Sequence, residues 1–272
     1  MNNTIQVIIE VESESLKEEL IAQLSTLQFD AFEEKEEHLE AFIKEENFDE
    51  KKLREILLQY DVPYRSLVIE EQNWNALWES NFSAVEVGDF CAIRAHFHPP
   101  FTNKQHEIII TPKMSFGTGH HATTYIMISE MAKIDFKDKQ VADFGTGTGV
   151  LAILADKLGS EEVWAIDYDD WSIENSKENI ARNDSKNVII EKTDSFSGRQ
   201  KFDVILANIN KHVILNNVNG LSSGLNKGGK LLLSGLLKED EPDIVSAFTA
   251  KGLKLLSTSG KNNWICLLFQ GV

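Results

Sequence analysis

The stretch VADFGTGTGVLAI at residues 141–153 begins as an apolar run, passes through a glycine-rich turn and continues as a second apolar run. Its pattern predicts a buried β-strand before the turn and an α-helix after it. Glycines in such a turn let the backbone approach a ligand and adopt conformations that a Cβ atom would block. Asp167 ends the next predicted strand, where an acidic side chain accepts hydrogen bonds from a ribose diol. This arrangement indicates a site for a nucleoside-containing cofactor.

The spacing of the glycines distinguishes two classes of cofactor. A dinucleotide fingerprint reads GxGxxG and would put its third glycine at position 150, which Val150 occupies. Here the spacing is GxGxG, starting at Gly145, and Asp143 stands two residues before that glycine. The pattern resembles the first motif of the S-adenosylmethionine (SAM) methyltransferases more than a nicotinamide site. Taken alone, it is also compatible with a tight turn that needs only small residues.

The order of the elements after residue 84 indicates an α/β domain. Apolar runs alternate with helical patterns at 149–158, 171–183, 212–226 and 241–251. Strands that are apolar on both faces and separated by helices favour a parallel, doubly wound sheet. The sequence GKNN at 260–263 suits a hairpin, so the final strand should be antiparallel. We predict a seven-stranded, doubly wound, Rossmann-like methyltransferase domain over 84–272, with strands at 141–144, 162–167, 187–192, 202–209, 229–235, 253–259 and 264–270.

Residues 1–71 differ from the rest of the chain in composition and in element order. Residues 1–72 hold 19 acidic and 7 basic residues, a net charge of −12, and all 16 glycines lie at Gly88 or later. The patterns predict β-α-β-β-α-β, a small ferredoxin-like α+β domain, with Ser13 or Ser15 as the first N-cap. The predicted elements are 4–12, 14–27, 29–35, 38–45, 49–60 and 64–70. No catalytic constellation is visible in this part of the sequence, so we expect a binding or docking domain.

Residues 72–83 connect the two predicted domains. Trp74, Leu77, Trp78 and Phe82 fall on one helical face, which predicts a linker helix, or hinge, packed on a neighbouring domain. An exposed aromatic ligand site is the alternative interpretation.

Charge and cysteine content narrow the functional classes. The net charge of −16 argues against a broad basic surface for nucleic acid and permits a basic partner, although an acidic surface without any binding role is the alternative. Cys91 and Cys266 lie in separate apolar runs, which indicates buried thiols in a reducing cytoplasm. We see no signal peptide and no run of about 18 apolar residues that would span a membrane. We also expect a monomer.

Two further motifs contain residues that could bind a ligand or take part in catalysis. Asn208 stands at the end of the predicted strand 202–209, where asparagine is often only a turn residue. Alternatively, its side-chain oxygen accepts a hydrogen bond from a target amine and orients the nitrogen lone pair. The loop SFGTGHHATT at 115–124 precedes a predicted helix, and its simplest interpretation is a glycine-rich loop with a threonine N-cap. His120 and His121 are adjacent and point apart, with no further ligand at zinc spacing, so we expect no metal.

The complete set of motifs resembles one known family. FGTGHHATT is followed 21 residues later by the first glycine of DFGTGTG, and then by AIDYD, ANI and LLLSGLL. With the tryptophan-rich linker and the small N-terminal domain, these motifs resemble the ribosomal protein L-eleven methyltransferase family, PrmA, over nearly the whole chain. The resemblance implies a class I SAM-dependent enzyme that trimethylates lysine side chains and the N-terminal α-amine of that basic protein of the large ribosomal subunit. It also implies a mobile N-terminal domain that holds this substrate.

The resemblance assigns roles to individual residues. It implies that the cofactor is bound by Thr124, Gly145, Gly147, Asp167 and Asn208. Asp167 would bind the ribose, and Asn208 would position the amine. The loop that would close over the cofactor and the methyl group comprises Phe116, Gly117, Thr118, Gly119 and His120. The chain departs from the family at Thr146 and Thr148, where cysteine and serine are common, and at Asn210-Lys211, where more apolar residues are usual.

Other functions stay open at the level of the sequence. The main alternative is a SAM-dependent N-methyltransferase that acts on a different protein or on a small-molecule amine. A nucleobase substrate is disfavoured by the acidic balance and because ANI lacks the aromatic residue that stacks on flipped bases. A SAM-binding module without activity would not need an amine-facing motif. We assign no general base, and His120 or His121 could assist deprotonation.

Overall fold

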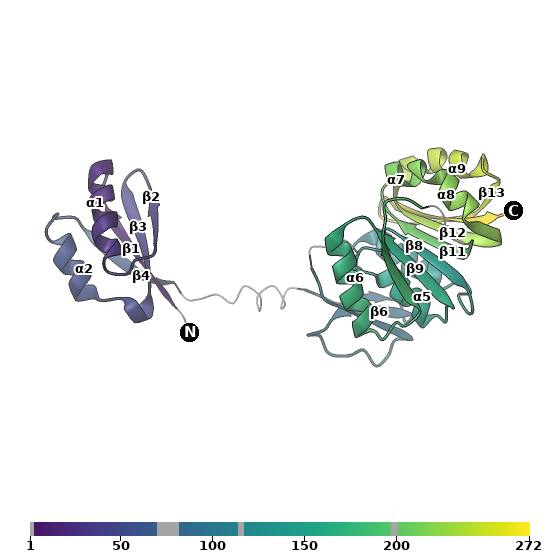
Figure 1. The fold of residues 1–272 in the computed structure, drawn as a ribbon, viewed down its shortest axis with the longest axis horizontal. Coiled ribbons are helices and arrows are strands. Elements are labelled where there is room, and N and C mark those ends of the chain that lie inside the picture. The colour runs from purple at the N-terminus through teal and green to yellow at the C-terminus, as the bar shows by residue number, and fades with distance from the viewer. Residues whose placement is uncertain (1–2, 70–81, 114–116, 197–200) are drawn as a thin grey trace. The chain divides into compact units, whose positions relative to one another are not determined.

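The computed structural model describes residues 3–69, 82–113, 117–196 and 201–272. Contacts divide the chain into two compact units, Met1–Asn81 and Phe82–Val272 (Figure 1). Most of the predicted linker, including both of its tryptophans, lies outside the described residues, as does Phe116.

The N-terminal unit is a four-stranded antiparallel sheet with two helices. Its elements are β1 (Thr4–Glu10), α1 (Glu14–Ser25), β2 (Ala31–Glu34), β3 (His38–Lys44), the 3-10 turn η1 (Glu45–Asn47), α2 (Glu50–Leu57) and β4 (Tyr64–Ile69). The strand order is β2-β3-β1-β4, and the order of strands and helices along the chain is the predicted one. Ser13 caps α1 by accepting a hydrogen bond from the Leu16 N–H (3.4 Å). The core consists of fully buried residues from both helices and the sheet, among them Val7, Ile9, Leu20, Leu24, Leu39 and Leu53.

The C-terminal unit contains a large mixed sheet. Its strands are β8 (Gln140–Phe144), β9 (Glu162–Asp167), β10 (Val188–Lys192), β11 (Phe202–Asn208), β12 (Leu225–Leu237), β13 (Leu253–Lys261) and β14 (Trp264–Gly271). The order across the sheet is β10-β9-β8-β11-β12-β14-β13. The first five strands in this order run parallel, and β14 is antiparallel to both of its neighbours, as the GKNN hairpin predicted. The chain reverses its direction of travel across the sheet between β8 and β11, and ligands bind at such switch points.

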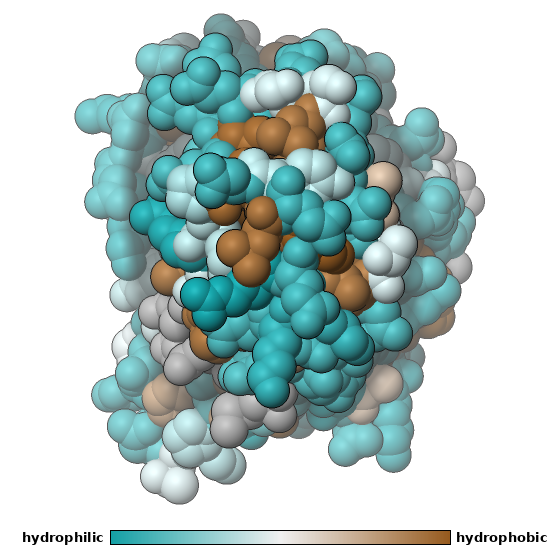
Figure 2. All heavy atoms as spheres, turned by 90° about the vertical axis from the view of Figure 1, so that its left-hand side faces the viewer, coloured by the Kyte–Doolittle hydropathy of each residue, from teal (hydrophilic) through white to brown (hydrophobic). Residues whose placement is uncertain are grey.

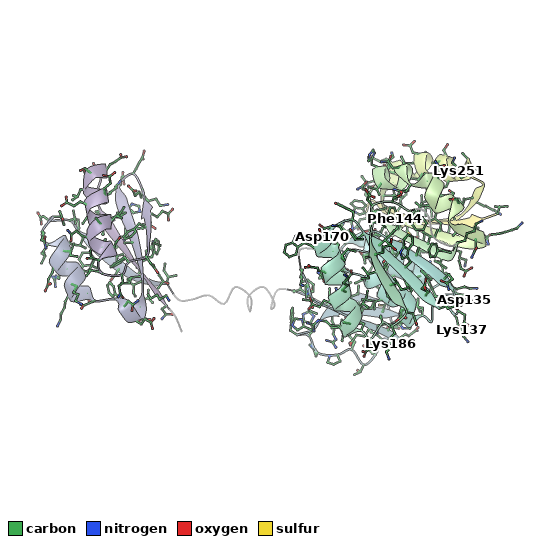
Figure 3. All side chains as sticks on the ribbon, in the orientation of Figure 1. Asp135, Lys137, Phe144, Asp170, Lys186 and Lys251 are labelled. Atoms are coloured by element: carbon green, nitrogen blue, oxygen red, sulfur yellow. The ribbon has the colours of Figure 1, made fainter. Side chains whose placement is uncertain are left out.

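Helices cover both faces of this sheet. They are α4 (Ala122–Met131), α5 (Val150–Lys157), α6 (Asp170–Arg182), α7 (Lys211–Asn216), α8 (Val218–Ser223), the 3-10 turn η2 (Lys238–Asp240) and α9 (Glu241–Thr249). One core cluster includes residues of α4 and α5, and a second includes residues of α7, α8 and α9. The single helix predicted over 212–226 is wrong, because the structure has two short helices that meet at Asn217 and end at Ser223, and Leu225 already begins β12. The Asn217 side chain bonds to the Val213 carbonyl and the Phe196 N–H instead of facing solvent. Phe144 lies within these layers, whereas Lys186 and Lys251 lie at the periphery (Figure 3).

A small sheet precedes the large one and was not predicted. It consists of β5 (Val85–Val87), β6 (Cys91–Ala95) and β7 (His106–Ile110), in which β5 and β6 are antiparallel and β6 and β7 are parallel. Asn183, the C-cap residue of α6, holds β7 through hydrogen bonds to the Ile109 N–H (2.9 Å) and carbonyl (2.7 Å). Cys91 of β6 and Cys266 of β14 are buried free thiols, as expected. Burial raises the pKa of the Cys91 thiol to about 12.

The face shown in Figure 2 is mostly hydrophilic, with hydrophobic side chains in small groups. No helix in the described part of the chain has the length and apolar content needed to cross a membrane.

Candidate cofactor and acceptor site

The glycine turn between β8 and α5 has the backbone conformation that only glycine adopts without strain. Gly145, Gly147 and Gly149 have φ of +76°, +54° and +81°. The N–H groups of Gly145 and Thr146 both donate to the Ile166 carbonyl of β9 (2.9 Å each), which fixes the turn against the neighbouring strand. A Cβ atom on Gly145 would lie 2.3 Å from Ile209 Cγ2. Glycine is therefore required here by conformation and by packing.

Asp167 ends β9 and holds the same turn. Its Oδ2 accepts a hydrogen bond from the Gly147 N–H (2.9 Å), and its Oδ1 accepts one from the Asp169 N–H (3.1 Å). The side chain is buried but reaches a cavity. A carboxylate oxygen can accept two hydrogen bonds, so each oxygen of Asp167 retains acceptor capacity for a ligand hydroxyl.

Asp143 is a fully buried carboxyl beneath the turn. Burial, opposed by a hydrogen bond from Thr146 Oγ1 to its Oδ2 (2.7 Å) and reinforced by the charge of Asp167, raises its pKa to about 7. Its Oδ1 is a buried oxygen without a hydrogen-bond partner among the described residues. Thr146 thus supplies a hydroxyl donor to this buried carboxyl.

Asn208 ends β11 next to the switch point. Its side chain is 9% exposed, and its Nδ2 donates to Thr124 Oγ1 of α4 (3.4 Å). Its Oδ1 is buried and, in the part of the chain that the structure describes, has no hydrogen-bond partner. Leaving a buried acceptor unsatisfied costs about 1–3 kcal/mol, so this oxygen is suited to a donor supplied by a ligand.

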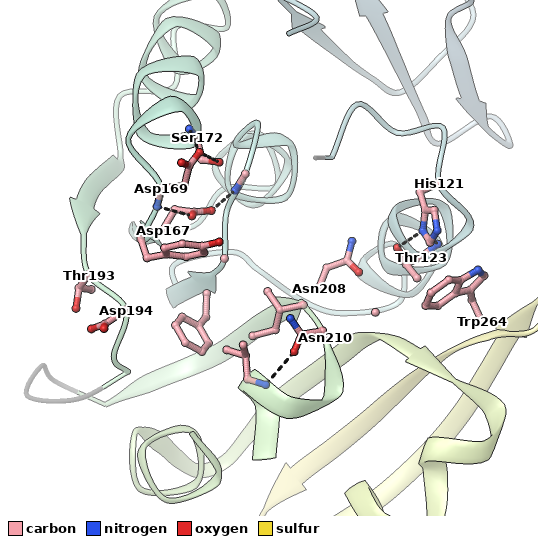
Figure 4. Close-up of a pocket in the computed structure, with 17 residues that line it drawn as sticks. His121, Thr123, Asp167, Asp169, Ser172, Thr193, Asp194, Asn208, Asn210 and Trp264 are labelled. Atoms are coloured by element: carbon pink, nitrogen blue, oxygen red, sulfur yellow. Dashed lines mark hydrogen bonds between the residues drawn. The ribbon is translucent and has the colours of Figure 1, made fainter. Parts of the chain in front are cut away.

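These residues meet around one cavity of about 550 Å³. Figure 4 shows Asp167, Asp169, Ser172, Thr193 and Asp194 on one side and His121, Thr123 and Trp264 on the other, with Asn208 between them. The remaining lining residues are Phe144, Gly145, Gly147, Tyr168, Ile209, Asn210, Val213 and Gly235. This volume is typical of pockets for small molecules and cofactors.

The sequence-predicted site residues occupy different places relative to this cavity. Gly145, Gly147, Asp167 and Asn208 line it, whereas Thr124 lies behind Asn208 as its hydrogen-bond partner.

Gly117 and Thr118 are not among the lining residues. The Gly117 carbonyl accepts a hydrogen bond from Thr148 Oγ1 (2.7 Å), which ties this loop to the glycine turn. The structure therefore brings together the end of β8, the end of β9 and the end of β11, with the 117–121 loop attached beside them.

The two adjacent histidines have separate environments. His120 Nε2 donates to the Ser83 carbonyl (2.9 Å), its Nδ1 lies 3.1 Å from Thr118 Oγ1, and it does not line the cavity. His121 lines the cavity, and its Nδ1 accepts from the Thr123 N–H (3.4 Å). His121, and not a threonine, is thus the N-cap of α4. No group of three or more His, Cys, Asp or Glu in the described residues could hold a metal ion.

Sequence reasoning missed several lining residues. Tyr168, Thr193 and Asp194 follow β9 and β10 directly, so the rule that ligands bind at the carboxyl ends of parallel strands could have found them. Trp264 begins β14, and because β14 is antiparallel, its first residue lies at the edge where the parallel strands end. The predicted antiparallel hairpin could therefore have placed Trp264 at this edge of the sheet.

Comparison with known proteins shows the family to which this chain belongs. The sequence profile described as "Ribosomal protein L11 methyltransferase (PrmA)" matches residues 3–271. The chain belongs to this family. It is 39% identical over 268 residues to the ribosomal protein L11 methyltransferase of Porphyromonas gingivalis, with 96% of this chain and 92% of that protein covered. It is 37% identical over 265 residues to the one of Phocaeicola vulgatus, with 94% of each covered.

A solved structure agrees with the sequence matches. The crystal structure of a ribosomal protein L11 methylase from Lactobacillus delbrueckii subsp. bulgaricus superimposes with a TM-score of 0.64 at 29% identity, covering 70% of this chain and 99% of that one. The family resemblance read from FGTGHHATT and DFGTGTG is therefore confirmed, and with it the class of SAM-dependent protein methyltransferase.

Proposed function

We propose that this protein methylates amino groups, lysine side chains and the N-terminal α-amine, of ribosomal protein L11 with SAM as the methyl donor. One observation carries the proposal. Asn208, whose buried Oδ1 has no hydrogen-bond partner among the described residues, lines the same cavity as the glycine turn and Asp167. The residues proposed to bind the cofactor and the residue proposed to accept an amine N–H thus line the same cavity.

The residues present fit SAM. Gly145 and Gly147 offer a surface without side chains, and Asp167 at the end of β9 would accept hydrogen bonds from the ribose hydroxyls. Thr124 would support this site through its contact with Asn208. The loop residues Phe116, Gly117 and Thr118 would close over the bound molecule. When bound, SAM supplies a methyl carbon that its positively charged sulfonium sulfur has already activated.

The chain contributes positioning more than proton transfer. A free lysine has a pKa of about 10.4, and transfer into a cavity next to a positive charge lowers it by desolvation and repulsion. Asn208 Oδ1 would then accept an N–H of the neutral amine and align its lone pair with the reacting carbon. Alignment of this kind can supply several kcal/mol of catalysis, so no strong general base is required.

The N-terminal unit would hold the substrate. We classify it as ferredoxin-like on its element order and strand order, and the C-terminal unit as the predicted seven-stranded Rossmann-like domain. A groove of about 620 Å³ in the N-terminal unit is lined by Glu10, Glu12 and Glu37 together with His38 and Arg65, so its carboxylates outnumber its one arginine. Since ribosomal proteins are generally basic, these carboxylates and the charge of −12 would attract the substrate. We further propose a cytoplasmic monomer, in keeping with the two free thiols.

The test is methyl transfer to purified L11, followed by mass spectrometry of its peptides. Asn208→Ala should lower turnover by about a hundredfold, in the range expected for lost orientation, and change SAM affinity little. Asn210→Ala is the matched control, because Asn210 lines the same cavity but its Oδ1 already accepts the Val213 N–H (3.0 Å). Loss of SAM binding in the Asn208 variant would contradict the assigned role.

Incubation of the enzyme with labelled SAM and a cell extract separates the alternative substrates. Label in one small basic protein supports L11, whereas label in another protein or in small metabolites supports an N-methyltransferase of different specificity.

A further inference from the structure

Trp264 stands opposite the cofactor side of the cavity. It is the first residue of β14, where it pairs with Leu237 of β12 and Lys261 of β13, and its side chain is partly buried. It lines the same cavity as Asn208, on the side away from Asp167 and Asp194 (Figure 4).

A short chain of contacts fixes Trp264 relative to Asn208. Ser234 of β12 is the register partner of Asn208, and its Oγ donates to the carbonyl of Ile265, the residue next to Trp264 (2.8 Å). From the other direction, the indole packs against the His121 ring, with centroids 4.6 Å apart and planes at 70°. His121 is itself held as the N-cap of α4. An aromatic side chain is thus built rigidly into the amine side of the cavity.

The number of N–H groups on the acceptor falls with each methyl transfer. A neutral primary amine has two N–H groups, a monomethylamine has one and a dimethylamine has none. The Asn208 Oδ1 can therefore orient the primary amine and the monomethylamine by accepting a hydrogen bond. The dimethylamine has no N–H group to donate to it. The third acceptor must be oriented by packing, and its product is a quaternary ammonium, which aromatic faces bind well.

We propose that Trp264 determines how far methylation proceeds, by packing against the N-methyl groups of the dimethylamine and of the product cation. This inference rests on the proposed function. Each transfer forms one N–C bond and breaks the S–C bond of the donor, which leaves as S-adenosylhomocysteine. After the first and second transfers the ammonium loses a proton to solvent before it can react again, whereas the third product has no proton to lose.

The experiment compares two forms of the substrate. Unmodified L11 reports the first transfer, and L11 whose amines have been dimethylated chemically with formaldehyde and a borohydride reports the third transfer alone. Trp264→Ala should slow the third transfer by roughly tenfold more than the first, in the range of a desolvated cation–π contact. Its products on unmodified L11 should shift from trimethyl to mono- and dimethyl groups. Trp264→Phe should restore most of the third transfer.

Control variants distinguish a specific role of Trp264 from a general loss of structure or activity. Trp171→Ala removes a tryptophan that is 73% exposed and does not line the cavity, so it should leave the product distribution unchanged. Asn208→Ala should have the opposite pattern and slow the first transfer more than the third. Equal slowing of both transfers in Trp264→Ala, or an unchanged product distribution, would overturn the inference. Failure of the unaltered enzyme to methylate either form of L11 would instead overturn the proposed function.

Discussion

Substitution of Gly145 by alanine tests the reasoning about the cofactor turn. Gly145 has φ of +76°, and an added Cβ atom would lie 2.3 Å from Ile209 Cγ2. Gly228 in β12 is a matched control, because its φ is +78° and a Cβ atom there would meet nothing within 4 Å. The two variants therefore share the backbone cost and differ in the steric overlap.

The expected magnitudes follow from these two terms. The left-handed conformation costs a residue with a Cβ atom about 1–2 kcal/mol, which applies to both variants. The overlap with Ile209 adds about 1–3 kcal/mol at position 145, as for other overpacked sites. We expect Gly228→Ala to lower the free energy of unfolding by about 1–2 kcal/mol and Gly145→Ala by about 2–5 kcal/mol. SAM affinity should fall only in the Gly145 variant, since Gly145 lines the cavity and Gly228 does not.

Urea denaturation, with linear extrapolation to water, measures the free energy of unfolding, and calorimetric titration measures SAM affinity. A double variant, Gly145→Ala with Ile209→Ala, removes the overlapping methyl group and should recover the 1–3 kcal/mol excess as a coupling energy of about that size. Equal destabilisation by Gly145→Ala and Gly228→Ala would refute the steric argument. Absence of coupling with Ile209 would refute it as well.

Three further predictions follow. Asp143 has a folded pKa of about 7 against 3.8 ordinarily, so the folded state binds its proton more tightly than the unfolded state does. The contribution of Asp143 to the free energy of unfolding therefore falls by about 4 kcal/mol as pH rises from about 4 to 7. Thermal unfolding of Asp143→Asn should lack this contribution, and an identical pH dependence in the variant would contradict the assignment. Asp167→Asn should weaken SAM binding by roughly 10–100-fold in calorimetry, because charge-assisted hydrogen bonds are lost; unchanged affinity would rule out the ribose role. Replacing Glu10, Glu12 and Glu37 together by glutamine should raise the KM for L11 severalfold without changing kcat. The same change at Glu14, Glu18 and Glu50 is the control, and an equal effect there would assign the attraction to net charge and not to the groove.

Local patterns predicted the elements that form the cofactor side of the site. Gly145, Gly147 and Asp167 lie within about 23 residues of sequence, and a strand, a turn and a helix of that kind can be read from spacing because the same geometry recurs in βαβ units. Asn208 could be placed because the carboxyl ends of neighbouring parallel strands meet at one edge. The buried thiols and the antiparallel final strand follow equally from apolar runs and turn residues.

Other features depend on residues far apart in the sequence. The sheet formed by β5, β6 and β7 went unpredicted because its strands are short and the parallel β6–β7 pair is separated by residues 96–105. The break at Asn217 depends on a bond to Phe196, and the separation of His120 from His121 depends on Ser83 and Trp264.

The sequence by itself therefore determined the family, the glycine turn and the position of Asn208, since these depend on short-range spacing and on the direction of parallel strands. Only the tertiary structure decided which side chains share a cavity with Asn208. Trp264 lies 56 residues beyond Asn208, and the two share a cavity only because β14 inserts antiparallel beside β12. The unpartnered Asn208 Oδ1 is likewise visible only in the fold, because whether a buried oxygen has a donor depends on every element packed around it.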